Sequence, residues 1–100
     1  MKHVWTWSGK FFGHIDNQDL WTYGGKHVGK LNGDEIYGRD GRYLGEVMND
    51  DRLITNTAKR SVSIESFTPQ PRRLGSAPYR NSYGYFMHPG HQDFPGPDEL

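Results

Sequence analysis

The chain has 100 residues, a hydrophobic fraction of 33% and a formal net charge of zero. A chain of this length forms at most one domain, and its neutral balance argues against a nucleic-acid partner, which usually requires a basic excess. The absence of cysteine excludes disulfides and thiolate metal sites. The N-terminus lacks the apolar segment of a secretory signal, and no apolar run approaches the roughly 20 residues of a membrane-spanning helix. We therefore expect a cytoplasmic protein with no membrane partner.

A sixteen-residue unit occurs three times without a gap in the first half of the chain, as Trp5–Leu20, Trp21–Ile36 and Tyr37–Arg52. Each unit begins with an aromatic residue, has glycine at its fifth and ninth positions and has Lys or Arg at its sixth. A fixed short period is typical of repeat architectures. A fourth, degenerate unit over residues 53–67 is one residue out of phase and lacks the glycines. Such a unit is expected at the end of an array, because terminal repeats serve as caps.

Turn signals separate short runs that are rich in aromatic and β-branched residues. Ser8-Gly9, Gly24-Gly25 and Asp40-Gly41 are typical of two-residue hairpin turns, and no segment has helical periodicity. The predicted strands span residues 3–7, 10–15, 20–23, 26–31, 35–39, 42–47, 52–56 and 60–65. Four two-stranded units would form an eight-stranded meander, which can close on itself and remove its own edges.

The glycine at the ninth position of each unit predicts a bulge in the second strand of each hairpin. The eighth and eleventh positions are apolar in all three units, yet they would face opposite sides of a regular strand. One extra residue between them returns both to the same face, and glycine often marks such a bulge. We expect structural roles for the unit glycines Gly9, Gly13, Gly25, Gly29, Gly41 and Gly45.

All six prolines lie after residue 67 and mark a change in composition. Because proline cannot donate to a sheet ladder, we expect a repeat domain over residues 1–67 and an extended or disordered tail over residues 68–100. The aromatic run Ser82–Met87 could add to a sheet edge of the same chain or of a neighbour. The alternative is a disordered linker that ends in a short linear motif over Phe94–Leu100. The candidate docking residues of the tail are Tyr83, Tyr85, Phe86 and Phe94.

The pattern resembles the bacterial four-fold β-flower family, whose units have the form aromatic-x-x-x-Gly-Arg/Lys-x-hydrophobic-Gly/Ala. The matching segments are Trp5–Gly13, Trp21–Gly29 and Tyr37–Gly45, and a proline-rich tail follows them as it does in the family. The resemblance implies an all-β fold of four tandem hairpin repeats in a closed or nearly closed ring. It implies no activity and no catalytic residue.

Two sets of repeated residues are candidates for a binding surface. Flat aromatic faces suit sugars, bases or peptide prolines, although the same residues could form the core of a domain that is poor in aliphatic side chains. Cations that follow each turn could hold a phosphate or a carboxylate at one rim, or could simply be exposed at hairpin corners. The aromatic set is Trp5, Trp21 and Tyr37, and the cationic set is Lys10, Lys26 and Arg42.

The sequence contains no set of residues that indicates catalysis. His88, His91 and Asp93 have a spacing that metal ligands on a loop could use. A structural zinc site, however, needs four ligands in fixed geometry. There is no nucleophile elbow and no phosphate-binding loop. We therefore expect no enzyme activity, no metal and no cofactor. The leading hypothesis is an interaction or scaffold module that self-associates or binds a protein partner. The alternative is a small-ligand protein that uses the aromatic ring and the cationic rim.

Overall fold

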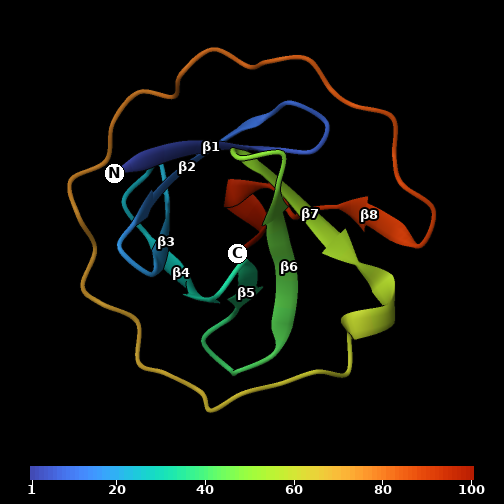
Figure 1. Ribbon diagram of the computed structural model, residues 1–100. Helices are drawn as coiled ribbons and strands as arrows, with labels where there is room; N and C mark the ends of the chain where they lie inside the picture. The colour runs from blue at the N-terminus through green and yellow to red at the C-terminus, as the bar shows by residue number, and fades with distance from the viewer.

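The computed structural model describes all 100 residues and is all-β, with seven strands in a closed barrel (Figure 1). The strands are β1 (Lys2–Thr6), β2 (Phe11–Asp16), β3 (Asp19–Thr22), β4 (His27–Asn32), β5 (Glu35–Tyr37), β6 (Tyr43–Met48) and β7 (Arg52–Asn56). Each strand pairs antiparallel with the next. Strands of a meander alternate in direction, so the first and the seventh run the same way. The barrel therefore closes through a parallel pairing of β1 with β7.

The eighth strand is supplied by the tail and not by residues 60–65, so the strand predicted there is wrong. That segment forms only an isolated bridge between Ser63 and Arg42, because the short 3₁₀ helix η1 (Thr57–Lys59) turns the chain away from the sheet directly after β7. β8 (His91–Asp93) pairs with the last three residues of β7. The first two residues of β7 face β1, which leaves the rest of that edge free for β8.

The interior of the barrel is mostly aliphatic. Its core consists of Val4, Phe12, Ile15, Leu20, Val28, Ile36, Leu53 and Phe94. Val4, Leu20 and Ile36 each directly precede a predicted aromatic of the ring, and successive side chains of a strand point to opposite faces. The opening aromatics are thus directed outward. Trp21 and Tyr37 are buried, but in a second layer outside the barrel and not in its core.

The predicted bulges are present and lie one residue before the glycines. Strand pairing shifts its register so that Phe12, Val28 and Leu44 each have no partner residue. The glycine that follows allows close packing of neighbouring strands, since a Cβ on Gly13 would lie 2.0 Å from the main-chain oxygen of Trp21. The second strand of each hairpin can therefore direct both of its apolar positions into the barrel.

Residues 60–90, called the belt below, run as an extended segment around the outside of the barrel, drawn from yellow to orange-red in Figure 1. Belt amides that are nine residues apart donate to main-chain oxygens that are sixteen residues apart. One set joins Ile64 to Gly41, Arg73 to Gly25 and Ser82 to Gly9, at 2.7, 2.8 and 2.8 Å. A second set joins Phe67 to Arg39, Ser76 to Tyr23 and Tyr85 to Trp7. The belt thus has a nine-residue period of its own and meets the three units in reverse order.

The hairpin loops beneath the belt have three residues, not the two that were predicted. In the second unit the Gly25 amide donates to the Thr22 oxygen and the Thr22 amide donates to the Lys26 oxygen, which closes the loop over residues 23–25. Gly25 has a φ of +90°, which glycine adopts far more readily than other residues. A Cβ at this position would lie 2.1 Å from the Arg73 oxygen of the belt. The loop glycines therefore serve both the turn and the contact with the belt.

After β8 the chain returns to the barrel axis, where its end lies at the centre of Figure 1. Phe94 packs edge-on against Phe12 with ring centroids 5.4 Å apart, and Leu100 packs against the core. Pro97 of the 3₁₀ helix η2 (Pro97–Glu99) is also buried. The segment Phe94–Leu100, called the plug below, is thus packed against its own barrel. This placement does not fit the interpretation of the segment as a free linear motif.

Candidate functional site

The predicted aromatic ring does not form an open binding surface. Trp21 is 0% exposed and Tyr37 is 2% exposed, while Trp5 is half-buried. Each ring contacts a cross-strand ring: Trp5 with Phe11 at 5.3 Å, Trp21 with His27 at 4.9 Å and Tyr37 with Tyr43 at 6.0 Å between centroids. The Arg73 guanidinium of the belt lies 3.8 Å over the Trp21 ring. Trp5 Nε1 donates to the Arg80 main-chain oxygen at 3.0 Å, so Trp5 and Trp21 join the barrel to the belt. Tyr37 donates to Glu35 within the barrel instead.

The three predicted cations do not converge on one point. Lys10 Nζ lies 3.7 Å from Asp98 Oδ1, Lys26 Nζ donates to the Leu100 main-chain oxygen at 2.6 Å, and Arg42 Nε lies 3.8 Å from Asp40 Oδ2. Two of the cations thus reach the plug, and the third stays at its own turn. The three cations therefore do not form the continuous cationic rim that the repeats predict.

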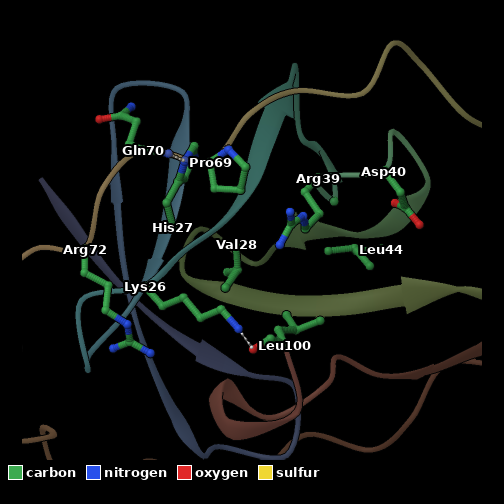
Figure 2. Close-up of a pocket in the computed structure, with 11 residues that line it drawn as sticks. Lys26, His27, Val28, Arg39, Asp40, Leu44, Pro69, Gln70, Arg72 and Leu100 are labelled. Carbon is green, nitrogen blue, oxygen red and sulfur yellow. Dashed lines mark hydrogen bonds between the residues drawn. The ribbon is translucent and has the colours of Figure 1, made fainter.

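One of these cations, Lys26, lines a cavity of about 550 Å³ between the barrel and the belt (Figure 2). This volume lies within the roughly 300–1,000 Å³ typical of small-ligand sites. Its apolar wall includes Val28, Leu44, Pro69 and Leu100, and its cations are Lys26, Arg39 and Arg72. Sequence reasoning did not identify Arg39 and Arg72. The signal that could have placed Arg72 beside the second unit is the nine-residue spacing of the belt, visible in Ser66, Gly75 and Gly84.

His27 forms one wall of the cavity as a neutral, structural side chain. Its Nδ1 lies 2.9 Å from the Gln70 amide, and because an amide can only donate, this nitrogen carries no proton. Nε2 therefore holds the proton, and it lies 3.0 Å from the Gly29 oxygen and 2.9 Å from Asp19 Oδ1. The ring also contacts Trp21 and Phe67. With both nitrogens engaged, His27 has no free nitrogen for a ligand or for proton transfer.

The family model described as 4-fold beta flower protein matches residues 1–87. The chain belongs to this family. The match covers the barrel and most of the belt, and it confirms the resemblance drawn from the repeats. No curated protein and no solved structure matches the chain. The family name describes a shape and no activity.

In this β-flower chain Lys59, the last residue of η1, belongs to an ion network on the outside of the barrel. Its Nζ lies 2.8 Å from Glu35 Oε2 and 3.0 Å from Glu46 Oε2. The hydrogen bond to Glu35 is the main cause of a raised pKa of Lys59, and the same bond lowers the pKa of Glu35. Lys59 and Glu35 are therefore held in their charged forms. The network joins η1 to β5 and β6 and offers no acid–base pair poised near neutral pH.

Metal-binding side chains do not gather in this β-flower structure. No group of three His, Cys, Asp or Glu side chains is arranged to hold an ion. The His88 and His91 rings are 5.7 Å apart, and His88 packs against Trp7. None of the helices is both long and apolar enough to cross a bilayer.

Lowering the pH from about 7.5 to about 5.5 should destabilise the fold through His14. Burial, followed by the nearby Arg73, lowers the pKa of His14 from 6.5. The unfolded chain therefore binds this proton more readily than the folded protein does. The contribution of His14 to the free energy of unfolding is fully present above pH 6.5 and is lost as the pH falls through the lowered pKa. Urea midpoints at the two pH values should differ less in His14→Gln than in the wild-type protein. Equal pH dependence in both proteins would remove His14 as the cause.

Proposed function

We propose that this protein is a non-enzymatic, cytoplasmic interaction module that presents the outer face of its belt to a protein partner or to a second copy of itself. The observation that carries this proposal is the exposure of three large apolar side chains, called the belt face below: Leu74 at 99%, Tyr83 at 83% and Phe86 at 100%. Tyr83 and Phe86 lie three residues apart on the belt. Large exposed apolar side chains can mark interaction surfaces, and aromatic anchors supply much of the energy of protein interfaces once they are buried there.

The backbone beneath the belt face is held in place by buried polar side chains. The Phe86 oxygen accepts a hydrogen bond from Trp7 Nε1 at 2.9 Å. The Arg52 guanidinium, which is 4% exposed, donates to the Tyr83 oxygen and to Ser82 Oγ. A surface that is already ordered loses less entropy when it binds. This rigidity supports recognition by the belt face and argues against a merely flexible tether.

Charge and architecture also support an association role. The net charge is zero, so no long-range repulsion opposes the approach of a second copy. We also propose that the three hairpin units form a scaffold together with a fourth unit, which consists of β7 and β8. The belt is displayed around this scaffold. In this arrangement the tail completes the scaffold and carries the binding residues.

The test compares the wild-type protein with Leu74→Ser/Tyr83→Ser/Phe86→Ser, and with Glu65→Ser as a control at an outward belt position. Sedimentation velocity at rising protein concentration measures self-association, and panning of a displayed-peptide library measures recognition of other chains. We expect association or peptide binding in the wild-type protein and the control, and its loss in the triple variant. Identical behaviour of all three proteins in both measurements would overturn the proposal.

A further inference from the structure

We infer that the cavity between barrel and belt binds an amphipathic anion, a small molecule with an apolar body and a carboxylate or phosphate head. This site is separate from the belt face, and it does not depend on the function proposed for that face. The inference rests on the chemistry of the lining, because an apolar wall and a set of incompletely paired cations meet in one space of about 550 Å³.

The cations of the cavity have few partners in the protein. No ion pair or hydrogen bond involves the Arg39 side chain, and the only polar contact of the Arg72 side chain is a long one of 3.4 Å to the Gly24 oxygen. Lys26 uses one of its three N–H donors on Leu100. Guanidinium groups recognise carboxylates and phosphates through paired hydrogen bonds. Arg39 and Arg72 are exposed to solvent, so an anionic head would replace water around their guanidinium groups with paired hydrogen bonds.

The other polar groups of the cavity leave the cations available. Asp40 is the only carboxylate side chain in the lining, and it already accepts from the Arg42 amide and lies near the Arg42 guanidinium. In Figure 2 Arg39 and Arg72 lie on either side of Val28 and Lys26, and Asp40 lies at the far edge. The lining therefore holds three cationic side chains against one carboxylate side chain, although the chain as a whole is neutral.

The apolar wall indicates a ligand with an apolar body and not a bare ion. Val28, Leu44 and Leu100 come from β4, β6 and the plug, and all three contribute to the core or pack against it. A second cavity of about 340 Å³ shares Lys26, Arg72 and Leu100 with the first. Asp98 also lines it, and its carboxylate lies 3.7 Å from Lys10 Nζ. Lys26 and Arg72 thus border both spaces, where a head group could lie between them while the body covers Val28 and Leu44.

The test uses the full chain and four probes, followed by amide chemical shifts in NMR. Octyl phosphate and octanoate carry both the head and the body, inorganic phosphate carries only the head, and octanol carries a neutral body. We expect saturable shifts around Val28, Gly38 and Leu44 with the first two probes and binding at least about tenfold weaker with the last two, because charged hydrogen bonds and apolar burial both contribute. The ratio of the two anion affinities identifies the preferred head.

The matched variants are Arg39→Gln/Arg72→Gln and Arg60→Gln/Arg80→Gln, which remove the same charge inside and outside the cavity. The first should weaken octyl phosphate binding by at least about tenfold, and the second should leave it unchanged. Equal loss in both variants, no loss in the first, or shifts centred on Tyr83 and Phe86 would overturn the inference. If the double variant fails to fold, Arg39→Gln alone decides the matter, since it removes a side chain that makes no polar contact. Unchanged octyl phosphate binding in Arg39→Gln would then overturn the inference.

Discussion

Replacing Phe94 by alanine should lower the free energy of unfolding by about 3–5 kcal/mol, the range typical of large-to-small substitutions of buried aromatics. Phe94 is 3% exposed and packs edge-on against Phe12 within the barrel. It also lies over β6, because a Cβ on Gly45 would be 2.6 Å from the Phe94 ring. The loss is a large part of the roughly 5–15 kcal/mol of a typical domain, and urea denaturation followed by tryptophan emission measures it.

The control is Phe86→Ala, the same chemical change eight residues earlier in the tail. Phe86 is 100% exposed, so its substitution should change the stability by no more than about 0.5 kcal/mol. If Phe94→Ala proves as mild as Phe86→Ala, the plug is not packed inside the barrel. The pair also separates two roles of the tail, because Phe86→Ala should impair association without affecting stability.

The local signals of the sequence predict the first seven strands well. Turn residues and alternating apolar residues act over a few positions, and the predicted strands agree with β1–β7 to within two residues at each end. The bulges could also be predicted, since two apolar positions on one face require an extra residue between them. What could not be predicted is the partner of the end of β7. The pairing of Ile54 with Asp93 spans a long stretch of chain, and no local rule chooses it over a hairpin with residues 60–65.

The candidate site was harder to predict than the barrel for the same reason. Lys26 could be identified because it repeats with the unit, but the neighbours of its side chain depend on the path of the belt. Arg72 lines the cavity beside Arg73, whose amide donates to the Gly25 oxygen. The nine-residue period that sets this register is carried mainly by small residues and prolines. Such residues are commonly read as signs of a linker.

Replacing Gly25 by alanine should lower the free energy of unfolding by about 2–5 kcal/mol. Gly25 has a φ of +90°, and its new Cβ would lie 2.1 Å from the Arg73 oxygen. The left-handed conformation costs about 1–2 kcal/mol for an L-residue, and overpacking against the belt backbone adds about 1–3 kcal/mol. Displacement of Arg73 should also uncover the Trp21 ring and shift its emission to longer wavelength. Urea denaturation and emission spectra measure both effects.

Gly33→Ala is the matched control, because it tests the backbone conformation without the belt. Gly33 has a φ of +64°, and no atom lies within 4 Å of the position of its Cβ. The control should therefore cost only the roughly 1–2 kcal/mol of the left-handed conformation and leave the emission unchanged. Equal costs for the two variants would mean that the belt does not rest on the hairpin turn. If the costs differ as expected, Gly25→Ala should also weaken octyl phosphate binding, because displacing the belt at Arg73 moves Arg72 away from the cavity that it lines.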